Sequence, residues 1–176
     1  VGTNPTRTGI LDALATMGAD VQVVNERIEG GEQVADLVAR SSDMHAADFS
    51  GDILPRMIDE VPVLALAACF AKGTTVISDA AELRVKESDR LKATTTELNR
   101  MGAHVEELDD GLRITGGHAL SGANAKTYSD HRIAMTMGIA GLLASGSTTI
   151  AAAETASISY PSFWDHLESL GGPSNS

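Results

Sequence analysis

Two long apolar segments limit the folds that are open to this chain. They span residues 55–72 and 130–144, and both are expected to be helical. Each segment is apolar on every side, whereas a helix with one face in water is apolar along only one stripe. Other elements must therefore cover both segments, which predicts a fold packed around two buried helices.

An internal repeat surrounds the apolar segments. Residues 14–21 correspond to residues 98–105, and both stretches carry Met-Gly-Ala at the same place. Residues 72–77 correspond in the same way to residues 145–150. The repeat is longer than the units of about 20–50 residues that build solenoids, so stacked short repeats are not expected.

Each unit is predicted to consist of a helix, two strands, an apolar helix and a strand. The units cover about residues 1–79 and 80–150, and residues 151–172 form part of a third, so we expect one α+β (mixed α/β) domain over residues 1–176. Expected helices lie at 5–17, 55–72, 88–101, 130–144 and 161–170, and expected strands at 19–24, 34–38, 74–78, 104–108, 112–115 and 147–150. Residues 27–31 are expected to turn, 41–53 and 116–125 to be irregular, and 173–176 to form a frayed tail.

The charge of the chain excludes several classes of partner. The formal net charge is −11, so neither a nucleic acid nor an anionic membrane is expected to bind. No apolar run reaches bilayer length without interruption and no signal peptide is visible, which favours a cytoplasmic protein. The chain opens at Val1 rather than at a methionine, as if it were cut from something longer.

The single cysteine and the histidines do not indicate a metal site. Cys69 lies inside an apolar run and is expected to be a small core residue, and one cysteine cannot form an intramolecular disulfide. The five histidines lack the spacing of metal ligands, and no glycine-rich phosphate loop is present. We therefore expect no metal site.

The most highly charged stretch lies at residues 84–90, just before a helical pattern. It contains three cations and two carboxylates, and Lys86 and Arg90 are four residues apart, as on one helix face. A helix N-terminus favours anions, so the stretch suits a phosphate or carboxylate clamp with Glu87 as an acid or base. The alternative is a solvated, salt-bridged first turn, and the stretch by itself favours that alternative.

Acidic residues also begin the two apolar segments. Asp59 and Glu60 lie near the start of the first and Asp130 at the start of the second, each followed by a long apolar run. They either cap a helix or face a cleft in which the helix starts meet. Arg132 follows His131 at a helix start, where its charge opposes the helix dipole. That cost is easier to explain if Arg132 holds an anion or a carboxylate, and the sequence leaves both interpretations open.

These motifs together resemble the 5-enolpyruvylshikimate-3-phosphate synthase family. Residues 83–91 and 129–135 carry the longest matches, and residues 4–9, 58–64 and 159–163 resemble the same family in the same order. The family enzyme is more than twice as long as this chain, so the resemblance covers its C-terminal lobe. It implies a lobe made of repeated βαβαββ units of the enolpyruvyl transferase fold, packed around buried helices.

The resemblance implies a reaction of aromatic amino-acid biosynthesis. The enolpyruvyl group of phosphoenolpyruvate is transferred to the 5-hydroxyl of shikimate 3-phosphate with release of phosphate, and glyphosate competes at the same site. No metal or organic cofactor is implied, and we expect a monomeric cytoplasmic enzyme. Because the N-terminal lobe is missing from this chain, we expect the chain alone to be inactive, or nearly so, and to bind either substrate weakly.

The resemblance also assigns roles to five residues. Asp59 corresponds to the carboxylate that binds the 5-hydroxyl of shikimate 3-phosphate and takes its proton. Glu87 corresponds to the carboxylate that protonates and then deprotonates the methylene carbon of phosphoenolpyruvate. Lys86 corresponds to a catalytic lysine near both substrates, and Arg90 and Arg132 to the arginines that bind phosphoenolpyruvate.

Two departures from the family pattern stand out. Some members carry a lysine just before the last motif, where this chain has Ser157, Ile158 and Ser159, so a third cationic contact to phosphoenolpyruvate is in question. Glu82 stands where some members carry an asparagine that touches shikimate 3-phosphate. Two other functions stay open: the sister transferase acting on UDP-N-acetylglucosamine, and an isolated or degenerate lobe used for binding or assembly.

Overall fold

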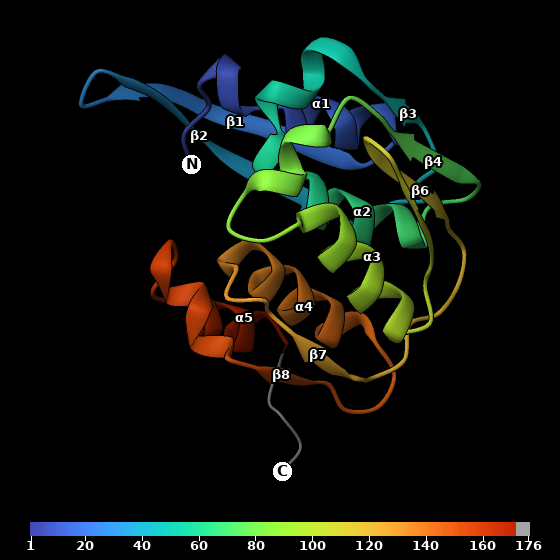
Figure 1. Cartoon of the computed structure of the whole chain (residues 1–176). Helices are drawn as coiled ribbons and strands as arrows, with labels where there is room; N and C mark the ends of the chain where they lie inside the picture. The colour runs from blue at the N-terminus through green and yellow to red at the C-terminus, as the bar shows by residue number, and fades with distance from the viewer. Residues whose placement is uncertain (172–176) are drawn as a thin grey trace.

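Three helices pack against one another at the centre of the molecule (Figure 1). They are α2 (Val61–Phe70), α3 (Arg90–Arg100) and α4 (His131–Leu143) in this computed structural model, which describes residues 1–171. Most side chains of α2 and α4 are buried, as expected for helices that are apolar on every side. The tail predicted at 173–176 lies outside the described residues.

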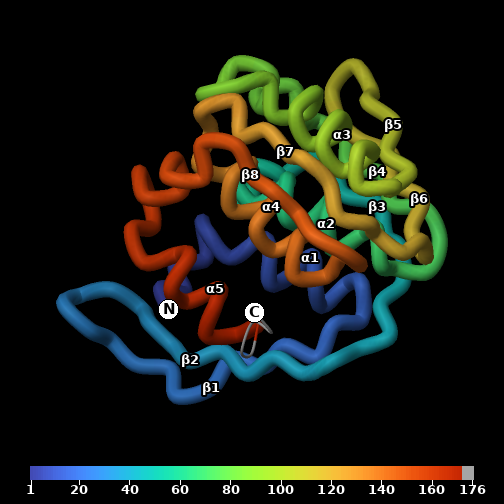
Figure 2. The backbone as a smooth tube through the Cα atoms, turned by 90° about the horizontal axis from the view of Figure 1, so that it is seen from below, coloured from blue at the N-terminus to red at the C-terminus, as the bar shows by residue number. Residues whose placement is uncertain are grey.

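Three separate sheets surround the helices. A four-stranded sheet has the order β3-β4-β6-β5, a long antiparallel ribbon joins β1 to β2, and β7 pairs with β8 in parallel. Figure 2 shows the β1–β2 ribbon along the lower edge of the view and the four-stranded sheet at the right. The strands are β1 (Asp20–Glu29), β2 (Glu32–Arg40), β3 (Asp48–Phe49), β4 (Thr74–Ile77), β5 (His104–Leu108), β6 (Gly111–Thr115), β7 (Asn124–Lys126) and β8 (Thr149–Ala151).

The order of elements recurs along the chain. The helix α1 (Gly9–Thr16) precedes β1, β2, β3, α2 and β4, and α3 precedes β5, β6, β7, α4 and β8 in the same order. In each case a parallel strand pair, β3–β4 or β7–β8, is connected through one of the buried helices. A last helix, α5 (Phe163–Gly171), packs on α4, where Gly138 leaves room for Trp164 and Phe163. The mixed α and β fold predicted from the sequence is confirmed.

The helix predicted over residues 55–72 is wrong in its first part. Residues 51–60 form two 3₁₀ turns, η2 (Gly51–Arg56) and η3 (Ile58–Glu60), and α2 begins only at Val61. Met57 separates the turns with a non-helical backbone (φ −143°, ψ 20°). Pro62, which has no N–H, then occupies the first turn of α2, where a missing donor costs nothing. Asp59 therefore lies before the helix, on a turn.

Three smaller predictions also differ from the structure. The strand β1 continues to Glu29. The turn predicted at 27–31 is therefore confined to Gly30 and Gly31, which both have positive φ. The irregular segments 41–53 and 116–125 contain the short strand β3 and the start of β7. The helix α3 begins at Arg90 because Asp89 caps it by accepting a hydrogen bond from the Lys92 N–H at 3.1 Å. Lys86 lies outside that helix, so Lys86 and Arg90 do not share a helical face.

None of the described helices is both long enough and apolar enough to cross a membrane. The remaining 3₁₀ segments are η1 (Pro5–Arg7), η4 (Ala81–Val85) and η5 (Ala153–Ile158).

Candidate active site

The N-terminal ends of the three central helices meet at one point. Arg90, the first residue of α3, contacts Asp59 just before α2 and Asp130 just before α4. The distances are 2.9 Å from Nη1 to an oxygen of Asp59 and 2.8 Å from Nε to an oxygen of Asp130. Because each helix start carries unpaired N–H groups and a partial positive charge, the place where they meet favours negatively charged groups.

Arg90 is the centre of this cluster. Its side chain is only 1% exposed, and its third nitrogen, Nη2, contacts Glu87 at 2.5 Å. Burial alone would lower the pKa of Arg90, but Asp130, Glu87 and Asp59 outweigh that effect and raise it. A buried arginine with three carboxylate partners stays charged and fixes the positions of those carboxylates.

Asp130 is the fully buried partner. It caps α4 by accepting a hydrogen bond from the Arg132 N–H at 2.9 Å, and it also accepts one from the Ser88 hydroxyl at 2.9 Å. Burial would raise the pKa of Asp130, but the hydrogen bond and the charge of Arg90 keep the pKa below its ordinary value. Asp130 therefore caps α4, as one interpretation predicted, and it also contacts Arg90 in the cluster.

The loop before Asp130 is held by a second buried carboxylate. Tyr128 and Ser129 both have positive φ (55° and 57°), which is uncommon and strained for residues other than glycine. The Tyr128 hydroxyl donates to the fully buried Glu97 of α3 at 2.7 Å. This contact ties the loop to α3, and nothing in the sequence pattern had singled out either residue.

Asp59 contacts three arginines. One oxygen accepts from Arg90, and the other lies 3.5 Å from Arg132 and 3.6 Å from Arg7. Burial would raise the pKa of Asp59, but the nearby Arg132 and Arg90 lower it overall, so Asp59 is ionised at neutral pH. Among the described residues, neither Asp59 nor Glu60 makes a side-chain cap on α2, so here the capping interpretation is wrong.

Arg132 is partly exposed and only loosely paired. Its nearest carboxylate contacts are Glu60 at 3.4 Å and Asp59 at 3.5 Å, longer than the 2.7–2.9 Å typical of strong charged hydrogen bonds. Its Nε is buried and has no hydrogen-bond partner among residues 1–171. An unpaired buried donor is costly, so Arg132 retains capacity to bind an anion.

A cavity of about 220 Å³ opens beside Arg132. Its polar end is formed by Asp59, Glu60 and Arg132, and its other walls are mainly apolar. Those walls come from α2, α4, the segment before α5 and the first residue of α5, and include Val63, Met135, Thr136, Ile139, Tyr160 and Phe163. The cavity therefore joins the charged cluster to an apolar wall.

The charged stretch 84–90 divides between two roles. Arg84 pairs with Asp89 at 3.0 Å and with Glu107 at 2.7 Å, which is the salt-bridged arrangement that the stretch by itself favoured. Arg90 instead turns inward to the cluster. Lys86 pairs with Glu82, so the carboxylate that departs from the family pattern has a cationic partner.

The structure thus brings together Asp59, Glu87, Arg90 and Arg132 of the residues selected from the sequence. Lys86 is next to Glu87 in the chain, but its ion pair is with Glu82. Arg7 was not selected, although it lies in the motif 4–9, which was the available signal. Cys69 is a buried core residue as expected, and its burial raises the pKa of its thiol to about 12.

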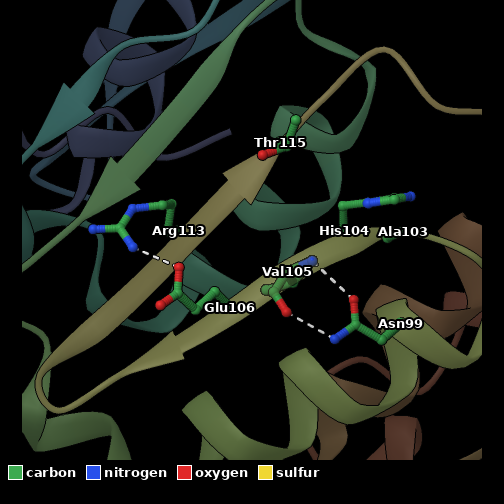
Figure 3. Close-up of a pocket in the computed structure, with 7 residues that line it drawn as sticks. All are labelled: Asn99, Ala103, His104, Val105, Glu106, Arg113 and Thr115. Atoms are coloured by element: carbon green, nitrogen blue, oxygen red, sulfur yellow. Dashed lines mark hydrogen bonds and ion pairs between the residues drawn. The ribbon is translucent and has the colours of Figure 1, made fainter.

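A larger cavity, of about 370 Å³, lies on the outer side of the β5–β6 hairpin (Figure 3). Two of its polar side chains are already engaged: Arg113 pairs with Glu106, and the Asn99 amide hydrogen-bonds both the N–H and the carbonyl of Val105. Because its charged groups are paired with each other, the candidate active site is the cluster at the convergent helix ends. No group of acidic, histidine or cysteine side chains within residues 1–171 is arranged to hold a metal.

Solved structures define the class of protein to which this arrangement belongs. EPSP synthase from Acinetobacter baumannii matches with a TM-score of 0.92 and 42% identity, over 98% of this chain and 40% of that one. The enolpyruvyl transferase NikO from Streptomyces tendae shares the fold, with a TM-score of 0.71 and 23% identity over 94% of this chain and 35% of that one. The fold is that of the enolpyruvyl transferases.

Within that class, the chain belongs to the EPSP synthase family. The family model for EPSP synthase (3-phosphoshikimate 1-carboxyvinyltransferase) matches residues 1–167. Proteins named 3-phosphoshikimate 1-carboxyvinyltransferase from Gloeobacter violaceus and Synechococcus elongatus are each 58% identical to it, over 95% and 98% of this chain. The chain spans 39% and 38% of the length of these curated relatives. The resemblance found in the sequence is confirmed.

Proposed function

We propose that residues 1–176 form the C-terminal lobe of a two-lobe 3-phosphoshikimate 1-carboxyvinyltransferase, with repeat units over about 1–79, 80–150 and 151–172. The lobe supplies half of a site that transfers the enolpyruvyl group of phosphoenolpyruvate to the 5-hydroxyl of shikimate 3-phosphate. The observation that carries the proposal is the Arg90 cluster, in which Asp59, Glu87 and Asp130 converge on one buried guanidinium in a chain of this family. Partial coverage of the relatives supports the assignment to one lobe.

The transfer is an addition followed by an elimination. In the addition, the 5-hydroxyl oxygen of shikimate 3-phosphate attacks C2 of phosphoenolpyruvate, and Asp59 takes the proton of that hydroxyl. At the same time Glu87 gives a proton to the methylene carbon. In the elimination the C2–O bond to phosphate breaks, and the leaving phosphate takes up the proton held by Asp59. Glu87 takes back a proton from the methyl group, which restores the double bond. The ionised state of Asp59 at neutral pH supports its role as a proton acceptor.

The cations bind the negative charges of the substrates. The open Nε of Arg132 and its long ion pairs support a direct contact with the carboxylate or phosphate of phosphoenolpyruvate. Lys86 contacts both substrates after leaving Glu82. The enzyme requires no metal or organic cofactor.

Arg90 binds phosphoenolpyruvate by exchanging one of its carboxylate partners. Of these, Glu87 is the most exposed, at 47% of its side chain, against 22% for Asp59 and 0% for Asp130. The incoming anion therefore displaces Glu87 most easily. In this way phosphoenolpyruvate binding releases the carboxylate that moves the proton at its methylene carbon.

Two alternatives are weaker. The sister transferase acting on UDP-N-acetylglucosamine shares the architecture, but the family match over residues 1–167 favours the shikimate enzyme. A lobe used only for binding or assembly has no need of three carboxylates on a buried arginine. We further propose that the whole enzyme is a cytoplasmic monomer, which size-exclusion chromatography with light scattering and cell fractionation test.

Calorimetric titration tests the division of the site between two lobes. The chain is titrated with shikimate 3-phosphate and then with phosphoenolpyruvate, first alone and then joined to the part of the Gloeobacter violaceus relative that it does not match. We expect weak or no binding to the chain alone and saturable binding of both substrates to the joined protein. Tight binding of both substrates by the chain alone would contradict the proposal.

A further inference from the structure

Arg7 is an exposed neighbour of Asp59, and the sequence patterns assigned it no role. It ends the 3₁₀ turn η1, and its Nη2 lies 3.6 Å from Oδ2 of Asp59. Its side chain is 63% exposed, and it makes no hydrogen bond to any residue that the structure describes. Arg7 is thus a largely free cation beside the carboxylate to which we assign the first proton transfer.

Polar contacts alone hold the turn that carries Arg7. No residue of η1 is buried. The Asn4 side chain accepts hydrogen bonds from the N–H and the hydroxyl of Thr6 at 3.0 and 2.8 Å, which closes the turn. Arg56 of η2 donates to the Pro5 carbonyl at 2.7 Å and to the Thr8 hydroxyl at 3.2 Å, which attaches the turn to the lobe. These hydrogen bonds therefore hold the backbone that carries Arg7.

The three arginines around Asp59 differ in what remains free on them. Arg90 is 1% exposed, holds Oδ1 and is engaged by carboxylates on every nitrogen. Arg132 and Arg7 are 26% and 63% exposed, and both approach Oδ2, at 3.5 and 3.6 Å. Two loosely held guanidinium groups on one side of a carboxylate form a place where a further anion can be bound by both.

We propose that Arg7 is a substrate-binding residue that acts with Arg132 to bind a carboxylate or phosphate group above Oδ2 of Asp59. The inference rests on the proposed function, because the anion is a group of one of its two substrates. Arg7 thereby supplies a third cation in a chain that has Ser157, Ile158 and Ser159 where some relatives carry a lysine. The test below determines which of the two substrates carries this anionic group.

The test uses the joined two-lobe protein with Arg7→Gln and Arg7→Lys. Arg113→Gln is the matched control, because Arg113 is an exposed arginine with one carboxylate partner on the β5–β6 hairpin (Figure 3). KM for each substrate and kcat are measured, and binding of each substrate is measured separately by calorimetry. Urea unfolding confirms that Arg7→Gln and Arg113→Gln are equally folded.

We expect Arg7→Gln to weaken the binding of one substrate by about 10- to 100-fold, which is the loss typical of one charged hydrogen bond. The affinity for the other substrate should change by less than about 3-fold. Arg7→Lys should recover part of the loss. The substrate whose binding is selectively weakened, phosphoenolpyruvate or shikimate 3-phosphate, is the one that carries the anionic group bound by Arg7. The proposal is overturned if Arg7→Gln matches Arg113→Gln, if it weakens both substrates equally, or if only kcat falls. A parent protein without turnover would instead count against the proposed function, and the calorimetric arm would still decide the role of Arg7.

Discussion

Arg90 and Asp130 form a buried ion pair across two helix ends, with Nε 2.8 Å from Oδ2 and side chains that are 1% and 0% exposed. The two residues are 40 positions apart in the sequence, and their contact joins the start of α3 to the start of α4. Removing Asp130 leaves the buried charge of Arg90 with two carboxylate partners in place of three, and without the only one of them that is fully buried. We therefore expect the pair to stabilise the fold as well as to belong to the candidate site.

Asp130→Asn should destabilise the chain by about 3 kcal/mol. This is the low end for breaking a buried ion pair, because Asp59 and Glu87 still partner Arg90 and asparagine still caps α4. The free energy of unfolding is measured by urea denaturation. Glu106→Gln is the control, since it breaks an exposed ion pair with Arg113 and should cost about 0–1 kcal/mol. Equal effects of the two substitutions would show that the Arg90 pair does not stabilise the fold.

The stability of the chain should fall in acid because of Asp59 and Asp130. Both carboxyls have a lowered pKa in the folded protein, since the arginines outweigh burial. Their stabilising contribution is fully present above the unfolded-state pKa of about 3.9 and is lost as the pH falls through the lower folded-state values. Urea unfolding of the wild type and of Asp130→Asn over a pH series measures this. The wild type should lose stability more steeply than Asp130→Asn below about pH 4, and parallel curves would contradict the assignment.

In the joined enzyme, Asp59→Asn should lower kcat by about 10²- to 10⁴-fold while the KM values change little. The substitution keeps the shape of the side chain but removes the carboxylate to which we assign acceptance of the proton of the 5-hydroxyl. Steady-state kinetics with both substrates measure the effect. Asp52→Asn, an exposed carboxyl of η2, is the control and should leave kcat unchanged. A large increase in KM at unchanged kcat would indicate a binding role for Asp59 instead.

Arg132→Gln should weaken the binding of phosphoenolpyruvate far more than the binding of shikimate 3-phosphate. The unpaired Nε and the long ion pairs of Arg132 leave it available for an anion, and one charged hydrogen bond corresponds to about 10- to 100-fold in affinity. Calorimetry with each substrate separates the two effects. Equal losses for both substrates would count against a specific contact with phosphoenolpyruvate.

Cys69 should be unreactive toward thiol reagents in the folded chain. Burial in α2 raises the pKa of its thiol to about 12, so almost no thiolate is present at neutral pH. The rate of modification by a chromogenic disulfide reagent is measured with and without denaturing urea. We expect modification only where the chain unfolds. Rapid reaction of the native chain would show that α2 is not covered as described.

The local patterns of the sequence predicted much of the fold. The helix α3 and the β5–β6 hairpin follow from helical spacing, from Gly102 as a stop, and from a tight turn before Gly111. The first apolar segment misled the prediction because an apolar run does not reveal where the backbone leaves the helix. Met57 breaks the run, and Asp59 consequently lies on a turn, where it reaches Arg90.

The candidate site was predictable as a set of residues but not as a set of contacts. The motifs selected Asp59, Glu87, Arg90 and Arg132 through their resemblance to a family. The contacts join residues 31 and 40 positions apart, and no periodicity reports such pairings. Burial of Arg90 was therefore invisible, and so was the position of Arg7, whose motif carries no charge pattern of its own.

Release of phosphate from phosphoenolpyruvate in the presence of shikimate 3-phosphate tests the central claim most directly. It is measured for the chain alone, for the N-terminal part of the Gloeobacter violaceus relative alone, and for the two joined. We expect turnover only when the two are joined, because we assign only half of the site to the cluster around Arg90. Detectable turnover by the chain without any other polypeptide would contradict it.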